Sequence, residues 1–227
     1  QVDGVILMSG YRVRPRGAPA LSLGKIPVVY VYQYTQDVPV PCIVPDDFGG
    51  AVAGTHHLLA LGRRRIAVIN GPTHYEATQR RLAGVQHAHQ EMGVPFDVGL
   101  VRVGKWYESS GYTLTHELMK SPQPPDALFC MSDSIASGAL GALSELGVRV
   151  PEDISLIGFD NRNFGLHQRP PLTTIALPLV EMGRLAGELV LQAIQSKEVQ
   201  SAAIHTVPCE LVIRQSCGGT VRPSTRL

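Results

Sequence analysis

The chain has 227 residues, of which 44% are hydrophobic, and this is enough for one large core or two smaller ones. The formal net charge is +1 and the basic residues are scattered, so the sequence offers no basic face for nucleic acid. No apolar run approaches the ~20 residues of a membrane helix, and the start QVDGVILMSG lacks the features of a signal peptide.

Strands and helices are expected to alternate along the chain. In chain order we expect a strand at Val2–Met8, an irregular stretch at Ser9–Lys25 with a weak helix near Ala18–Leu23, a strand at Pro27–Val31, a helix at Phe48–Leu61 capped by Asp46 or Asp47, a strand at Ile66–Ile69, a helix at Ala77–Met92, a strand at Leu100–Val103, a helix at Ser109–Met119, a strand at Ala127–Met131, a helix at Ser134–Leu146, strands at Ile154–Phe159 and Leu172–Leu177, a helix at Val180–Gln195, a strand at Thr206–Ile213 and a disordered tail at Gly218–Leu227. This alternation predicts right-handed βαβ units around a parallel sheet.

The segment Val150–Asp160 carries the first functional signal. A Pro-Glu-Asp turn leads into the apolar run Ile154–Phe159, which is typical of a strand buried on both faces. Ligands of open α/β sheets bind outside the carboxyl ends of such strands, so Asp160 is expected to lie where a ligand arrives.

Catalytic and metal-binding motifs are missing from the sequence. The four cysteines are widely separated, which favours reduced thiols in a cytoplasmic protein over a zinc site or disulfides. The eight histidines show no ligand spacing, and there is no G-x-S-x-G, P-loop or G-x-G-x-x-G motif. We therefore expect no metal, no cofactor and no enzymatic activity.

Several segments together closely resemble bacterial repressors of the lactose/galactose-repressor family. The main ones are GVRVPEDISLIGFD (Gly147–Asp160), PPLTTI (Pro170–Ile175) and EMGRLA (Glu181–Ala186). Further matches are PVVYV (Pro27–Val31), DDFGGA (Asp46–Ala51), HLLALGRRRIA (His57–Ala67), RLAG (Arg81–Gly84), SGY (Ser110–Tyr112) and SDSIASGAL (Ser132–Leu140). Their order and spacing hold across residues 2–216.

This resemblance implies an α/β fold of two doubly wound parallel-sheet subdomains, periplasmic-binding-protein-like and joined by crossover strands. The N-terminal subdomain would comprise residues 1–45 and 178–208, and the C-terminal subdomain residues 46–177 and 209–217, with an effector in the cleft between them. The family's N-terminal helix-turn-helix and the first elements of its N-terminal subdomain are absent, so we expect the chain to be a fragment or an incomplete sequence.

The resemblance also implies a function. The chain would be the effector-binding and dimerising part of a cytoplasmic transcriptional regulator, which contacts operator DNA through a helix-turn-helix outside this chain. The expected effector is a sugar or, second, a nucleobase. The alternative is a solute-binding protein of a sugar transporter, which shares the fold; a signal peptide or lipobox in the full gene would favour that alternative.

Three residues match positions where family members bind an effector. Asp160 would accept hydrogen bonds from hydroxyls or a ring nitrogen, and the alternative is that it caps the loop Asn161–Gly165. Arg81 would donate a fork of hydrogen bonds, and the alternative is a solvated helix face beside Arg80. Trp106 would stack on the effector, and the alternative is an ordinary core tryptophan.

Weaker candidates accompany these three residues. Ser132 falls where relatives often carry a polar effector contact, whereas Asp133 is interpreted as a helix cap. Tyr32 occupies a position that is often Asp in relatives, and Tyr75 would face the same cleft. The tyrosine at position 32 indicates a ligand other than a simple galactoside.

Overall fold

The structure, a computed structural model, describes residues 2–8, 26–32, 40–196 and 203–218. Two compact units make up the chain. Unit 1 comprises Gln1–Asp46, His74–Ala77 and Pro178–Cys209, and unit 2 comprises Asp47–Thr73, Thr78–Leu177 and Glu210–Leu227. Both are built from helices and predominantly parallel sheets, which confirms the predicted α/β class. The expected weak helix near Ala18–Leu23 and all but the first residue of the expected disordered tail lie outside the described residues.

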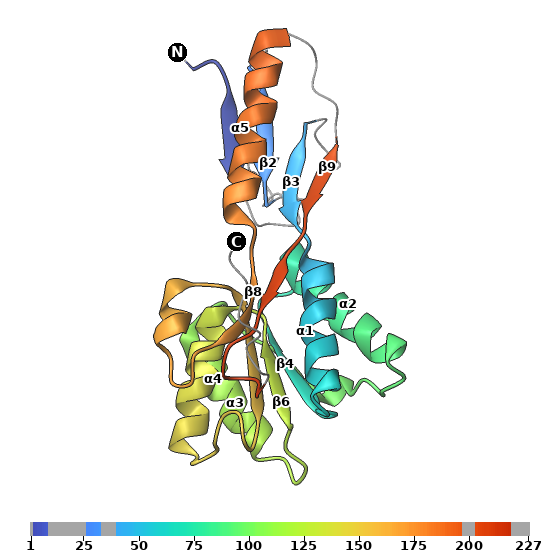
Figure 1. The fold of residues 1–227 in the computed structure, drawn as a ribbon, viewed down its shortest axis with the longest axis vertical. Helices are drawn as coiled ribbons and strands as arrows, with labels where there is room; N and C mark the ends of the chain where they lie inside the picture. Colours follow the sequence, from blue (N-terminus) through green and yellow to red (C-terminus); the bar gives the residue numbers. More distant parts are fainter. Residues whose placement is uncertain (1, 9–25, 33–39, 197–202, 219–227) are drawn as a thin grey trace, which may run out of the picture. The chain divides into compact units, whose positions relative to one another are not determined.

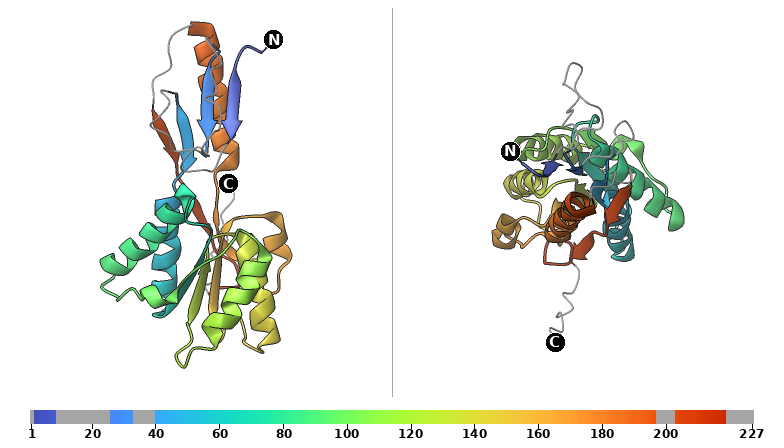
Figure 2. Two further views of the ribbon diagram at one scale, coloured as in Figure 1. Left: turned by 180° about the vertical axis from the view of Figure 1, so that it is seen from behind. Right: turned by 90° about the horizontal axis from the view of Figure 1, so that it is seen from above.

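Unit 1 is a parallel sheet of four described strands with one long helix against it. The sheet order is β1 (Val5–Met8), β2 (Val28–Val31), β3 (Cys42–Pro45) and β9 (Ile204–Val207), and neighbouring strands are parallel. Helix α5 (Leu179–Ser196) lies along one face of this sheet (Figures 1 and 2).

The apolar spacing of α5 explains this packing. Met182, Ala186, Val190 and Ala193 recur at intervals of three or four residues, so they form one stripe on the helix, and all four are buried. Three of them join a core cluster with strand residues that include Ile43. The amphipathic helix expected at Val180–Gln195 is therefore confirmed.

Unit 2 contains the larger sheet, with helices on both of its faces. Its elements are α1 (Asp47–Ala60), β4 (Ile66–Asn70), α2 (Glu76–Glu91), a 3-10 turn (Val98–Leu100), β5 (Val101–Val103), α3 (Glu108–Met119), β6 (Ala127–Cys130), α4 (Asp133–Glu145), β7 (Ser155–Asp160), a 3-10 turn (Asn163–His167), β8 (Thr173–Ala176) and β10 (Glu210–Val212). Helices α1 and α2 cover one face, and α3 and α4 cover the other (Figure 1). The start of α2 falls in the short segment that clusters with unit 1.

The strand order of unit 2 is β10-β8-β7-β6-β4-β5. Strands β5, β4, β6, β7 and β8 are parallel neighbours. From β4 the chain continues to β5 on one side and later returns to β6 on the other, so the strand order reverses at β4. Such a topological switch point is where open α/β sheets bind ligands, at the carboxyl ends of the strands.

The C-terminal strand differs from the prediction. The expected single strand Thr206–Ile213 is two strands: β9 pairs in parallel with β3 in unit 1, whereas β10 pairs antiparallel with β8 in unit 2. Pro208 stands at the break, where its missing N–H interrupts the hydrogen-bond ladder. The expectation of a wholly parallel arrangement is therefore wrong at β10.

Helices α3 and α4 approach each other closely through two glycines. A Cβ atom on Gly111 would lie 1.9 Å from the Ile135 carbonyl oxygen, and one on Gly138 would lie 1.9 Å from the Glu108 carbonyl oxygen. These obstacles are backbone atoms that cannot rotate away, so the two glycines set the distance between the helices.

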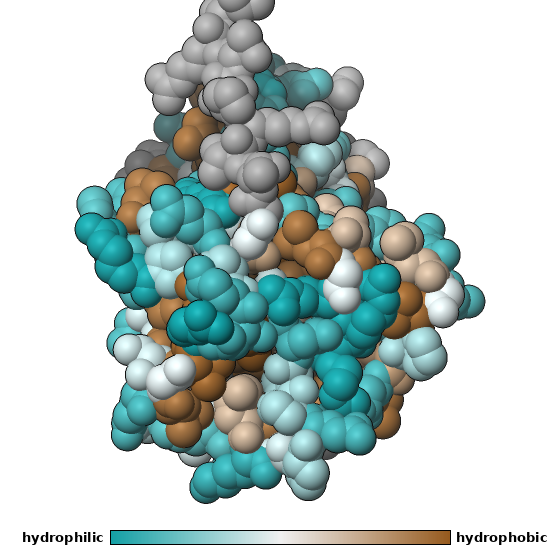
Figure 3. Space-filling model, turned by 60° about the horizontal axis from the view of Figure 1, so that its bottom comes forward, coloured by the Kyte–Doolittle hydropathy of each residue, from teal (hydrophilic) through white to brown (hydrophobic). Residues whose placement is uncertain are grey.

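In the described ranges, no helix combines the length and the apolar character needed to cross a membrane. Hydrophilic and hydrophobic residues are interspersed over the face of unit 2 seen in Figure 3.

Candidate functional site

The carboxyl ends of β4, β6 and β7 bring together several polar residues of unit 2. These strands are adjacent in the sheet, with β6 between the other two. Asn70 ends β4, Met131 and Ser132 follow β6, and Asp160 ends β7. Asn70 is buried, donates to the Thr78 carbonyl oxygen at 2.9 Å and accepts from the backbone N–H of the following residue at 2.9 Å, so it holds the turn after β4.

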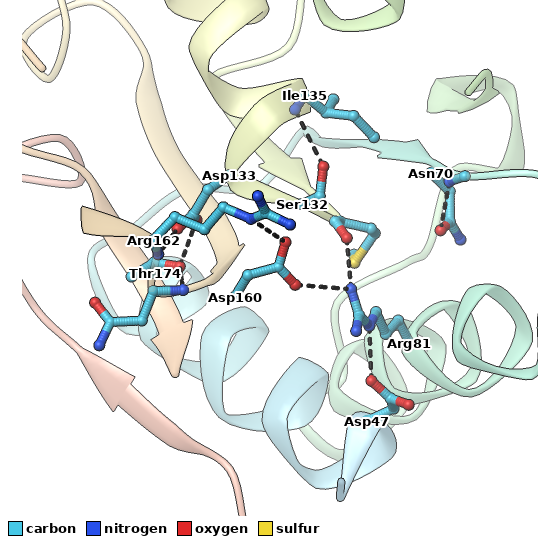
Figure 4. A network of polar contacts seen from close by, with 12 residues as sticks. Asp47, Asn70, Arg81, Ser132, Asp133, Ile135, Asp160, Arg162 and Thr174 are labelled. Carbon is cyan, nitrogen blue, oxygen red and sulfur yellow. Dashed lines mark hydrogen bonds and ion pairs between the residues drawn. The ribbon is translucent and has the colours of Figure 1, made fainter. Parts of the chain in front are cut away.

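Asp160 faces two cations. Its side chain is 18% exposed, with Oδ1 3.8 Å from Arg81 Nη1 and Oδ2 3.9 Å from Arg162 Nε (Figure 4). Burial raises the pKa of this carboxyl to about 7, although the charge of Arg81 opposes the shift. Near neutral pH the group therefore exists in both forms, and it can accept a hydrogen bond or donate one.

Arg81 is held by several partners and is only 5% exposed. Its Nε donates to Asp47 Oδ1 at 2.8 Å and its Nη1 donates to the Met131 carbonyl oxygen at 2.6 Å. Its Cζ lies 3.7 Å from the centre of the Phe159 ring and 5.7 Å from that of Trp106. The alternative of a solvated helix face is therefore excluded. No motif or spacing pointed to the partner Asp47, which lies 34 residues earlier in the chain.

Trp106 combines core packing with partial exposure. The half-buried indole packs against the main hydrophobic core of unit 2. It also presses on Gly71, where an added Cβ would lie 2.2 Å from the indole Cε2. Only glycine fits at position 71 without moving the ring. The expected stacking of an effector on Trp106 stays a prediction.

Ser132, and not Asp133, caps α4. The Ser132 backbone is extended (φ −158°, ψ 156°), and its Oγ accepts the Ile135 backbone N–H at 3.1 Å. The interpretation of Asp133 as the cap is therefore wrong, because Asp133 is the first helical residue and its carboxylate bonds elsewhere. The expected effector contact of Ser132 stays a prediction.

Asp133 fixes the loop after β7. It is fully buried, and its carboxylate accepts the Thr174 hydroxyl and the Arg162 backbone N–H, each at 2.6 Å (Figure 4). The loop-capping role considered for Asp160 thus belongs to Asp133. One residue of the sequence could have indicated this contact: Gly158 lies inside a strand, where a glycine often marks a close approach of another group. A Cβ atom at this position would lie 2.3 Å from Asp133 Oδ1.

The two tyrosine candidates belong to unit 1. Tyr32 follows β2, is half-buried and has φ 66°, while Tyr75 is half-buried with its ring centre 4.4 Å from that of His74. The expected roles of both tyrosines stay predictions. Of the candidates, Asp160, Arg81 and Trp106 are the three that the structure brings together within unit 2.

The chemistry of this cluster is that of recognition. A buried guanidinium, a carboxyl that can donate or accept, and an indole suit a small polar molecule with a flat or ring-shaped face. Among the described residues, no group of three or more His, Cys, Asp and Glu side chains is arranged to hold a metal ion.

A protein-family model and curated proteins match this chain. A family model described as a periplasmic binding protein-like domain matches residues 55–217. The HTH-type transcriptional repressor CytR of Escherichia coli (strain K12) is 34% identical over 216 residues, which cover 95% of this chain and 63% of CytR. The chain thus spans less than two thirds of the length of that curated relative.

Solved structures resemble the chain over most of its length. A regulatory protein of the LacI family from Chloroflexus aggregans has a TM-score of 0.86 and 28% identity, covering 96% of this chain and 77% of that one. The transcriptional regulator CelR, solved as a cellobiose complex, has a TM-score of 0.82 and 31% identity, covering 95% of this chain and 66% of CelR.

Proposed function

The chain belongs to the family of periplasmic binding protein-like domains, and on this premise we propose that it is the effector-binding part of a bacterial transcriptional repressor. The membership confirms the predicted resemblance and the periplasmic-binding-protein-like α/β fold. The relatives described above are a repressor, a regulatory protein of the LacI family and a transcriptional regulator, which favours a regulator over a transporter's solute-binding protein.

The observation that carries the proposal is the cluster of Asp160, Arg81 and Trp106 at the switch point of unit 2. Arg81 is fixed by Asp47 at 2.8 Å and by the Met131 carbonyl oxygen at 2.6 Å, so its position is set before a ligand arrives. Because little side-chain conformational entropy is then lost on binding, the affinity for a ligand is higher. The same fixed guanidinium lies beside the Asp160 carboxyl and the Trp106 ring.

The proposed effector is a neutral sugar, with a nucleobase as the second candidate. The charge of Arg81 is already balanced by the buried Asp47, so the pair is suited to directing hydrogen bonds at hydroxyls. The indole of Trp106 offers a face on which a sugar ring or a base can pack. CelR was solved with cellobiose, and we extend that ligand class to this chain as part of the proposal.

The proposed mechanism is a population shift. An effector that binds two conformations of the chain with different affinity changes their ratio by the difference between those affinities. In a cytoplasmic homodimer that carries DNA-reading modules, such a change would alter operator binding, because half-sites require a fixed spacing. The dimer, the operator and the DNA-binding module are all parts of the proposal.

A thermal-shift screen against neutral sugars, sugar phosphates and nucleobases tests the proposal. A ligand at about 100 times its Kd adds about 2.7 kcal/mol to the free energy of unfolding. We expect a neutral sugar to stabilise the chain, and Trp106→Ala and Asp160→Asn to abolish this stabilisation. Asp153→Asn is the matched control, since Asp153 is an exposed carboxylate of the same unit that bonds Arg149.

A stabilising ligand that is insensitive to both site variants would contradict the proposed site. The gene sequence upstream of this chain separates the two protein classes. A helix-turn-helix there supports the repressor, whereas a signal peptide or a lipobox supports the transporter's binding protein.

A further inference from the structure

The turn after β7 has a backbone conformation that L-amino acids rarely adopt. Asp160 has φ 116° and Asn161 has φ 58°, and neither is glycine. Such conformations cost free energy and persist only where surrounding contacts hold them. Since Asp160 is the first of the two residues, whatever holds the turn also sets the direction of the Asp160 side chain.

The contacts that hold the turn converge on one carboxylate. Asp133 Oδ2 accepts the Arg162 backbone N–H at 2.6 Å, and Oδ1 accepts the Thr174 hydroxyl at 2.6 Å. The same hydroxyl oxygen accepts the Asn161 backbone N–H at 3.3 Å. The two N–H groups that follow Asp160 are thus both linked to Asp133, one directly and one through Thr174 (Figure 4).

Asp133 is costly to bury, and its bonds all go to this region. The side chain is fully buried, and burial raises its pKa, whereas the bonds from Thr174 and from the Arg162 N–H oppose the shift. The helix cap next to it is already supplied by Ser132. The carboxylate therefore serves the turn and strand β8, and the absent side chain of Gly158 leaves room for it.

We propose that Asp133 is a positioning residue of the effector site: its carboxylate fixes the turn Asp160–Arg162 and thereby holds the Asp160 carboxyl beside Arg81. This role deepens the proposed function and rests on it, because Asp160 is the residue expected to meet the effector. Arg214 supports the same turn from outside, since its Nη2 donates to Asn161 Oδ1 at 2.6 Å.

The titration of Asp160 reports the position of its carboxyl. The charged groups that face it are Arg81 on α2, Asp47 on α1, Arg162 in the turn and Asp133 on α4. Burial is the main reason that its pKa is raised to about 7, so a carboxyl that swings out into water would return toward the ordinary value of about 3.9.

The decisive variant is Thr174→Val, which removes the linking hydroxyl but keeps the shape of the side chain and leaves the Asp133 carboxyl group in place. The pKa of Asp160 is measured in the ligand-free 227-residue chain by carboxyl-carbon NMR, with its signal assigned by comparison with Asp160→Asn. We expect Thr174→Val to lower this pKa by roughly one unit or more, and Thr174→Ser, which keeps the hydroxyl, to leave it unchanged.

Thr55→Val is the matched control. Thr55 is equally buried, and its hydroxyl donates to the Ala51 carbonyl oxygen within α1. Its loss should leave the titration of Asp160 unchanged. If Thr174→Val does not fold, Thr174→Ala makes the same hydroxyl deletion with a smaller side chain.

An unchanged pKa of Asp160 in the folded Thr174 variant would overturn the proposal, even if Asp133→Asn lowered it, because Asp133→Asn also removes a charge. The titration needs no effector, so it separates this role from the proposed function. If the chain binds no small molecule but the pKa of Asp160 changes as expected, the link between Asp133 and Asp160 is supported and the effector proposal is contradicted. If an effector binds but the pKa of Asp160 is unchanged in the Thr174 variant, the effector proposal stands and the positioning role of Asp133 is refuted.

Discussion

Asp160→Asn should make the ligand-free protein more stable at alkaline pH. The carboxyl is buried beside Arg81 and has its pKa raised to about 7, whereas the unfolded chain ionises it at about 3.9. An amide of nearly the same size cannot ionise, so the variant avoids the cost of a buried negative charge.

The sign follows from proton binding. Between the two pKa values the folded chain keeps the proton on Asp160 and the unfolded chain releases it, so the free energy of unfolding falls as the pH rises. This contribution is fully present below about pH 4 and is lost as the pH passes the folded pKa of about 7. A shift of about three units corresponds to ~4 kcal/mol, and water entry on relaxation reduces it, so we expect about 2 to 4 kcal/mol.

Urea unfolding at pH 5, 6, 7 and 8, followed by Trp106 fluorescence, measures this effect in unit 2. Trp106 is the single tryptophan of the chain and belongs to the same unit as Asp160. Because the unfolded chain already ionises this carboxyl at pH 5, the variant should be more stable by about 1 to 1.5 kcal/mol there, and this difference should grow to the full 2 to 4 kcal/mol by pH 8. Other titrations, such as those of His57 and His89, whose pKa values burial lowers, are common to both proteins and cancel.

A stability difference that is the same at pH 5 and pH 8 would refute this reasoning, and so would a variant that is less stable at pH 8. Asp153→Asn provides the opposite case. The hydrogen bond from Arg149 lowers the pKa of Asp153 to about 2, so its ionised form is favoured by folding. Relative to wild type, Asp153→Asn should therefore gain no free energy of unfolding between pH 5 and pH 8.

Further variants test the packing of unit 2 and its buried ion pair. Gly111→Ala and Gly138→Ala should each lower the free energy of unfolding by about 3 kcal/mol or more, because the added methyl meets carbonyl oxygens at 1.9 Å. Gly141 lies on α4 like Gly138, but a Cβ there would meet nothing within 4 Å, so Gly141→Ala should instead raise the free energy of unfolding by up to about 1 kcal/mol. Equal losses for all three variants in urea unfolding would contradict the close contact between α3 and α4. Asp47→Asn should cost about 3 to 5 kcal/mol alone and much less when added to Arg81→Leu, and additive losses would deny the coupling.

Most of unit 2 could be predicted from the sequence because its pattern is regular. The helices expected at Phe48–Leu61, Ala77–Met92 and Ser109–Met119 each begin and end within one residue of the observed α1, α2 and α3. The apolar pattern continues through Pro208 and therefore predicted a single strand; only the resemblance, which placed a subdomain boundary between residues 208 and 209, indicated that the two halves join different sheets. Strand pairing across distant segments decides that point.

The site was predicted less completely. Asp160 and Arg81 came from position and resemblance, but the bond of Arg81 to Asp47 joins two helices, and no local spacing reveals it. Asp133 was misassigned because Ser132 and Asp133 are both good N-cap residues and stand side by side. Only the observed backbone decides between them, since Ser132 is extended and Asp133 is helical.

The pairing of β3 with β9 has a consequence for the order of events during synthesis. Cys42 faces Ile204 in this pair, so about 160 residues must be translated between the two strands. At roughly 5 to 20 residues per second, β3 waits on the order of 10 to 30 s for its neighbour, while the whole parallel part of the other unit's sheet leaves the ribosome. The edge of β3 that will pair with β9 is therefore exposed until β9 has been made, and during this interval the nascent chain is most prone to aggregation.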